Sequence, residues 1–150
     1  MTYLVVTIAG LLAVDCIGYL WHRWVEHGAG PLSRAHHKHH EMDYPPERFL
    51  HLGAYRKNPD PAWYIPAVLV LGLAVVILPL GLFLAFATVA VGYALALNGV
   101  HERFHVQGNP LERIRWFLRL RALHLNHHRY PANYSILAFW MDRLCGSYLP

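Results

Sequence analysis

The sequence predicts an all-α membrane protein of about three transmembrane helices, with histidine-bearing helices that cap a dinuclear metal site on the cytoplasmic side. Hydrophobic residues make up 55% of the 150 residues and charged residues only 15%, a balance closer to membrane than to soluble proteins. The charged residues and the 12 histidines are also kept apart from long apolar runs. The length fits one domain, which we place at residues 1–150.

The first predicted span is Thr2 to Leu20, in which Asp15 is the only charged residue. Its length is close to the roughly 20 residues that cross a bilayer as a helix. The stretch lacks a basic start and an obvious small-residue cleavage site, so we interpret it as a retained span rather than a signal peptide.

The second and third spans are predicted within the 39 residues from 62 to 100, which contain no Asp, Glu, Lys, Arg or His. This run is too long for one span and suits two of roughly 20 residues each. Pro79 and Gly81 favour a tight hairpin between them.

The basic residues predict the orientation, because all 13 Lys and Arg lie in residues 21–61 or 101–150. By the positive-inside rule both segments, and with them the histidines and the C-terminus, face the cytoplasm of a multi-pass protein. The net charge of +4 thus reflects topology and attraction to anionic lipid rather than to nucleic acid. Cys16 and Cys145 are too few for a thiolate metal site, and we expect no disulfide between them.

Eleven of the histidines lie in four motifs, HRWVEH, HHKHH, HERFH and HLNHH. The pattern HxxHH occurs twice, and its positions i, i+3 and i+4 share one helical face, so three imidazoles could converge on one point. His22 and His27 are five residues apart, about 140° around an ideal helix. This pair therefore needs a helix end, a local bulge or two different metals.

So many imidazoles exceed what one ion can use, and two metal ions fit the count. Imidazole binds iron, zinc, copper and nickel, so the ligand type does not choose among them. We interpret His37 and His51 as surface or core residues. The alternative for the whole set is a histidine-rich loop that binds metal weakly and without chemical purpose.

These motifs, in this order around apolar spans, resemble the fatty acid hydroxylase and sterol desaturase superfamily, from Asp15 to the C-terminus. Around the first motif the resemblance includes Tyr19 and Arg23. After the last motif it covers NHHRYPANYS and WMDRLCGSY, with matches at Asn133, Tyr134, Trp140, Asp142, Arg143, Gly146, Ser147 and Tyr148. The first motif departs from the HxxxH of many fatty acid hydroxylases, since HxxxxH is typical of bacterial carotenoid ring hydroxylases. The third motif is HxxxH, where those enzymes tend to have one more residue.

The resemblance implies an integral membrane oxidoreductase that uses O2 and a histidine-bound metal pair, generally two iron ions, to hydroxylate or desaturate lipids. Zinc is a substitute that such ligands also accept. The implied ligands are His22, His27, His36, His39, His40, His101, His105, His124, His127 and His128. In the second motif either His36 or His37 could take the first position.

The resemblance favours a fatty acyl or sphingolipid-like substrate, because PPERFLH follows the second motif as a Pro-Pro element does in fatty acid 2-hydroxylases. A carotenoid ring and sterol-type desaturation are the alternatives within the class. From another class, the histidines could serve a membrane metal-ion binding or transport protein. A transporter should place its ligands near the bilayer midplane, however, and the second and third spans carry none.

Asp15 and Asn98 are the supporting residues that we expect at the centre. Asn98 precedes His101 by three residues and could orient a ligand or a metal-bound water, although a polar helix cap is an equal interpretation. Asp15 is costly within a span and could contact a histidine. We expect Glu26 and Glu102 to face solvent or to pair with Arg23 or Arg103.

The remaining expectations concern partners. Leu111 to Leu123 predicts a helix on the membrane surface, whose arginines could attract an acidic electron donor. The chain has no GxGxxG or CxxCH motif and no cysteine cluster. An external ferredoxin or cytochrome b5-like carrier with a reductase is therefore implied. Three short spans hardly enclose a site, so the surface helices must cap it, and a homo-oligomer would help.

Overall fold

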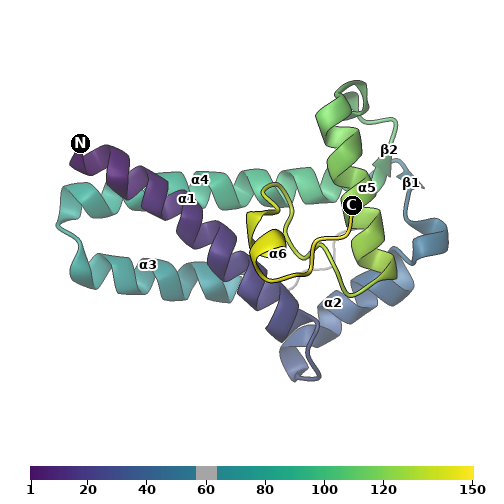
Figure 1. The fold of residues 1–150 in the computed structure, drawn as a ribbon, viewed down its shortest axis with the longest axis horizontal. Coiled ribbons are helices and arrows are strands. Elements are labelled where there is room, and N and C mark those ends of the chain that lie inside the picture. Colours follow the sequence, from purple (N-terminus) through teal and green to yellow (C-terminus); the bar gives the residue numbers. More distant parts are fainter. Residues whose placement is uncertain (57–63) are drawn as a thin grey trace.

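Three apolar helices run alongside one another in the computed structural model, which describes residues 1–56 and 64–150 (Figure 1). They are α1 (Thr2–Trp21), α3 (Ile65–Ile77) and α4 (Leu80–Phe104). Helix α1 crosses over the antiparallel pair α3 and α4 and contacts both. The hairpin falls at Leu78 and Pro79, as the sequence predicted.

Two of the helical segments, Thr2–Glu26 and Leu80–Phe104, are long and apolar enough to cross a membrane. Helix α3 has 13 residues, about 20 Å at 1.5 Å per residue, which is less than a hydrocarbon core of about 30 Å. The prediction of three full-length spans is therefore not met by the described residues. The expected start of the second span, residues 62 and 63, lies outside them.

The polar segments fold across one end of the apolar helices (Figure 1). Two short parallel strands, His51–Leu52 and Val106–Gln107, join them, an addition that the all-α prediction lacked. The elements are η1 (His22–Glu26), η2 (Pro31–Ser33), α2 (Arg34–Lys38), η3 (His39–Asp43), η4 (Pro46–Arg48), β1, β2, η6 (Pro110–Arg113), α5 (Arg115–Arg129) and α6 (Trp140–Leu144).

Helix α5 holds this polar end together through one apolar face. Phe117, Leu120 and Leu123 are buried against Phe49 and Phe104. The predicted surface helix starts later than expected, at Arg115, because residues 110–113 form a 3-10 turn. Since the buried face of α5 also carries histidines, the packing of this helix sets their position.

The segment after α5 is fastened by one buried carboxylate. Asp142 accepts hydrogen bonds from the backbone N–H groups of Tyr134 and Ser135, at 2.8 and 2.9 Å, and from the hydroxyl of Ser147, at 2.8 Å. Asn133 has a positive φ of 55°, and its side chain donates to the carbonyls of Leu123 and Leu149. These bonds explain why polar residues are buried in this segment.

We expect Asp142→Asn to lower the free energy of unfolding by about 2–3 kcal/mol, because an amide replaces one charged acceptor with a donor that faces a buried N–H. Thermal unfolding in detergent, followed by circular dichroism, measures the loss. Arg143→Gln, one residue along and exposed, is the control and should change little. Equal midpoints for Asp142→Asn and wild type would contradict this role of the carboxylate.

Candidate metal centre

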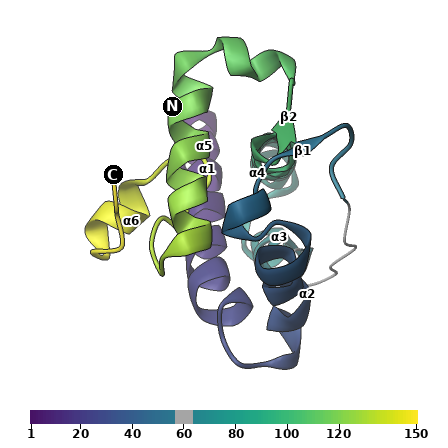
Figure 2. The ribbon, with the colours of Figure 1, turned by 90° about the vertical axis from the view of Figure 1, so that its right-hand side faces the viewer.

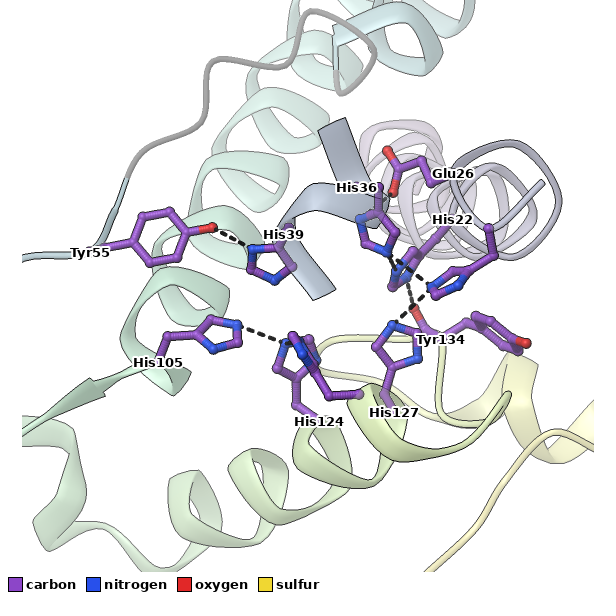
Figure 3. A network of polar contacts seen from close by, with 11 residues as sticks. His22, Glu26, His36, His39, Tyr55, His105, His124, His127 and Tyr134 are labelled. Carbon is purple, nitrogen blue, oxygen red and sulfur yellow. Dashed lines mark hydrogen bonds and ion pairs between the residues drawn. The ribbon is translucent and has the colours of Figure 1, made fainter. Parts of the chain in front are cut away.

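Nine histidines meet at the polar end in two adjacent groups, as far as residues 1–56 and 64–150 show. Each residue offers one ring nitrogen, and within a group these atoms all lie within 4.8 Å of one another. Figure 3 shows rings from η1, α2, η3 and α5, and that of His105 just after α4, turned toward a common space. The first group is His22, His27, His36, His40 and His127, and the second is His39, His105, His124 and His128.

Each HxxHH motif divides its rings between the two groups. His36 and His40 join the first group, whereas His39 joins the second. The last motif does the reverse, with His124 and His128 in the second group and only His127 in the first. The expectation that three rings converge on one point is wrong, because positions i+3 and i+4 differ by about 100° and can straddle two neighbouring sites.

His22 and His27 reach the same group through a π-helical turn. The residues His22–Glu26 form this turn, and His27 donates its backbone N–H to the carbonyl of His22 at 3.1 Å. A π-helix places residues i and i+5 close to one another on one side of the helix. Two histidines five residues apart can therefore belong to the same group. A second π-turn, His39–Asp43, follows α2.

His101 lies beside the second group but is not one of the histidines whose ring nitrogens all lie within 4.8 Å of one another. Its ring is buried, with its centre 4.7 Å from the ring of His124 and 5.1 Å from that of His39. Within the part of the chain that the structure describes, His37 and His51 belong to neither group. His51 instead points a ring nitrogen at the carbonyl of Asp43, 3.1 Å away.

Backbone carbonyls hold one nitrogen of several rings. The Nδ1 atoms of His127 and His128 lie 2.8 Å from the carbonyls of Ala132 and Tyr44. His105 contacts the carbonyl of Phe49 in the same way at 3.2 Å, and His22 contacts that of Tyr134. A carbonyl only accepts, so the proton of each neutral ring sits on Nδ1 and the lone pair of Nε2 points inward.

The inward nitrogens lie within hydrogen-bonding distance of one another. The Nε2 atom of His105 lies 3.1 Å from that of His124, which lies 3.3 Å from that of His128. In the first group the His36 Nε2 atom lies 3.0 Å from those of His22 and His27. Two nitrogens each about 2.1 Å from one ion are about 3.0–3.4 Å apart at right-angled or tetrahedral positions. The spacing therefore fits ligands of a shared metal ion.

Burial keeps these rings neutral. Desolvation, together with the smaller effect of neighbouring histidines, lowers the pKa of His27 and of His128 to about 3. The pKa values of His39 and His127 fall for the same two reasons. Neutral imidazoles at pH 7 offer lone pairs rather than protons, as metal binding requires.

Among the buried nitrogens without a hydrogen-bond partner in the described residues are three of the centre, the Nε2 atoms of His39 and His40 and the Nδ1 atom of His124. A buried polar atom without a partner costs roughly 1–3 kcal/mol, and a coordinated ion removes that cost. The donors are all imidazole nitrogens, which suit iron or zinc. The residues present therefore fit a bound metal.

Glu26 is a member of the centre that sequence reasoning missed. Its carboxylate is 0% exposed, and Oε2 lies 3.6 Å from Nδ1 of His36 (Figure 3). The expectation that Glu26 faces solvent or pairs with Arg23 is wrong, because the π-turn rotates it inward. The unusual spacing of His22 and His27 was the signal that could have revealed that rotation.

Two tyrosines that the sequence did not predict, Tyr44 and Tyr55, also contact histidines of the second group. The hydroxyl of Tyr55 lies 3.4 Å from Nδ1 of His39. The ring of Tyr44 is buried between those of Tyr55 and His105, with its centre 5.2 and 4.1 Å from theirs. Neither lies in a histidine motif, so no spacing pointed to them.

Asp15 and Asn98, the predicted supporting residues, make other contacts. Asp15 accepts hydrogen bonds from the hydroxyl of Tyr93 at 2.9 Å and from the indole of Trp140 at 3.1 Å. It therefore joins α1 to α4 and α6 instead of contacting a histidine. The amide of Asn98 donates to the carboxylate of Glu102 at 3.1 Å, on an exposed face one turn along α4. Asn98 lies inside α4, whose C-cap is His105, so its side chain neither caps the helix nor makes the expected contact with a histidine.

Comparison with known proteins gives one match. A family model described as fatty acid hydroxylase matches residues 7–147, a range that includes every histidine of both groups. No curated protein and no solved structure matches the chain.

We expect the metal-free protein to lose stability as the pH falls from about 6.5 toward 3. In this window the unfolded histidines bind protons and the buried ones do not, so unfolding is favoured by about 1.4 kcal/mol per pH unit for each histidine. Above about 6.5 both states are neutral and this effect ends. Denaturant unfolding at pH 7, 6, 5 and 4 measures the change, and equal stability at all four values would refute the burial of neutral rings.

We expect Glu26→Gln to weaken metal binding about tenfold or more, because a carboxylate beside Nδ1 holds the ring of His36 and strengthens Nε2 as a donor. Competition with a chelator measures the affinity directly. Glu41→Gln is the matched control, since Glu41 is exposed on η3. Unchanged affinity in Glu26→Gln would mean that the carboxylate only fills space.

Proposed function

The chain belongs to the fatty acid hydroxylase family, and on that premise we propose that it hydroxylates an unactivated C–H bond of a membrane lipid with O2, at two histidine-bound iron ions. The observation that carries the proposal is the pair of adjacent, buried histidine groups with inward nitrogens 3.0–3.3 Å apart. Two such groups are more than a structural metal site needs.

The ligand assignment follows the two groups. One ion would be held by His22, His27, His36, His40 and His127, and the other by His39, His105, His124 and His128, with His101 beside it. Bound iron would supply oxygen activation and hydrogen abstraction, chemistry that side chains alone do not provide. Zinc would bind the same nitrogens without that redox chemistry.

The chain's own residues would position and shield this chemistry. Carbonyls of Tyr44, Phe49, Ala132 and Tyr134 fix the rings, so little reorganisation accompanies metal binding. Burial of the groups excludes bulk water. These features favour a reaction that must keep a reactive centre away from solvent.

The apolar helices support a lipid substrate. Large hydrophobic side chains such as Val68, Val76 and Leu84 are exposed on α3 and α4, which is what contact with lipid requires. The centre lies where these helices end, so an acyl chain in the bilayer could approach it. We propose a fatty acyl or sphingolipid-like substrate. The HxxxxH spacing of the first motif favours a carotenoid ring as the second candidate.

The proposal also covers the orientation of the protein in the membrane and the source of its electrons. Two apolar helices and the family indicate a membrane protein. We propose that the histidine end and the C-terminus face the cytoplasm, by the distribution of basic residues. Electrons would come from an external ferredoxin or cytochrome b5-like carrier and its reductase.

We expect expression of the chain to add one oxygen to a membrane lipid, and His39→Ala and His127→Ala each to abolish that product while leaving membrane insertion intact. One variant removes a ligand from each group, so both ions are tested. Mass spectrometry of extracted lipids measures the product. His37→Ala is the matched control and should keep it. Formation of the product by either ligand variant would contradict the assignment of His39 and His127 as metal ligands.

A further inference from the structure

A surface cavity of about 370 Å³ lies next to the histidine groups. Its lining comes from the turn η4 and the end of α5, namely Pro46, Glu47, His128, Arg129 and Tyr130. These two elements contact each other. They lie on the side that faces the viewer in Figure 2, opposite to the direction in which the apolar helices extend.

His128 belongs both to this cavity and to the second histidine group. Its side chain is 8% exposed, and its Nε2 atom lies 3.3 Å from that of His124 inside the group. Its ring also stacks on that of His40, a member of the first group, with the centres 3.9 Å apart. One imidazole therefore connects the surface to both groups.

Two exposed arginines and one exposed glutamate lie in the cavity lining or next to it. Arg129 lines it and is exposed, and exposed Arg48 follows in η4, whereas Glu47 is the one acidic residue in the lining. Helix α5 carries four arginines and neither Asp nor Glu. A protein surface of opposite charge would be drawn to this face.

We propose that an acidic one-electron carrier protein docks over this cavity and that electrons reach the metal centre through His128. The inference rests on the proposed function, since hydroxylation (R–H + O2 + 2 electrons + 2 protons giving R–OH + H2O) needs two electrons. Two reduced iron–sulfur carriers would each supply one electron and leave oxidised. Electron transfer weakens steeply with distance, so a ligand ring at the floor of a cavity is a favourable point of approach.

An anionic membrane surface is the other class of partner that arginines attract. The geometry disfavours it, because α5, whose C-terminal end lines the cavity, lies at the opposite end of the molecule from the α3–α4 hairpin (Figure 1). The cavity is also built around a histidine of the centre, which contact with lipid would not use.

The first experiment measures binding without turnover. A fluorescently labelled plant-type ferredoxin, a small acidic carrier, is titrated into the metal-free protein in nanodiscs. We expect Arg129→Glu and Arg48→Glu each to weaken binding about tenfold at low salt, with the affinity of the wild type falling as salt rises. Arg113→Glu, exposed on η6 at the other end of α5, is the matched control and should bind as the wild type does.

Three results would overturn the docking site. One is absence of ferredoxin binding by the wild type, and another is equal affinity in Arg129→Glu, Arg48→Glu and the wild type. The third is a loss of binding to phosphatidylserine vesicles in Arg129→Glu with ferredoxin affinity unchanged, which would mark the face as a membrane surface.

A second experiment separates this inference from the proposed function. Metal-loaded protein that is reduced by dithionite without O2, freed of the reductant and then exposed to O2 should form product in a single turnover. This holds for both the wild type and Arg129→Glu, because a small reductant needs no docking. Reduced ferredoxin should reduce the centre about tenfold more slowly in Arg129→Glu, by stopped-flow absorbance. No product with either reductant in the wild type contradicts the proposed function. Product with dithionite together with equal reduction rates contradicts the docking site alone.

Discussion

The convergence of buried imidazole nitrogens is the constraint on which the rest of this structure depends. Burial keeps the rings neutral. Carbonyl contacts at Nδ1 direct the protons of four rings outward, those of His22, His105, His127 and His128. The Nε2 atoms lie 3.0–3.3 Å apart, a spacing that suits hydrogen bonds between the rings and also a shared ion. Charging the rings by protonation would bring like charges together. A bound cation instead accepts the converging lone pairs at neutral pH.

The carbonyls that orient the rings come from segments far from the histidines in sequence. His22 is held by Tyr134, and the backbone of Tyr134 is held in turn by Asp142. His128 is held by Tyr44, 84 residues away. The closing segment of the chain therefore acts on the centre without contributing a ligand. A buried aspartate and an asparagine in the left-handed region are needed there for backbone geometry rather than for chemistry.

Sequence reasoning located the parts of the centre better than their arrangement. The number of histidines predicted two ions, and Pro79 predicted the hairpin, because composition and local chain geometry can be read directly from a sequence. The division of each HxxHH motif between two groups depends on how helices face each other, which no single spacing reveals. Asp15 shows the same limit, since Tyr93 and Trp140 lie far along the chain. Glu26 was misplaced because a carboxylate was expected to face solvent or an arginine, whereas the π-turn of the backbone buries it beside His36.

That π-turn explains the unusual first motif. In an α-helix, two ligands four residues apart lie on one face, which suits HxxxH; the wider hydrogen-bonded ring of a π-turn gives the same alignment to HxxxxH. The inserted residue is thus absorbed by the backbone, and the ligand set is preserved. The longer motif is compensated by the change from an α-helical to a π-helical turn. Deleting Val25 would keep every histidine yet leave a spacing that fits only a regular helix.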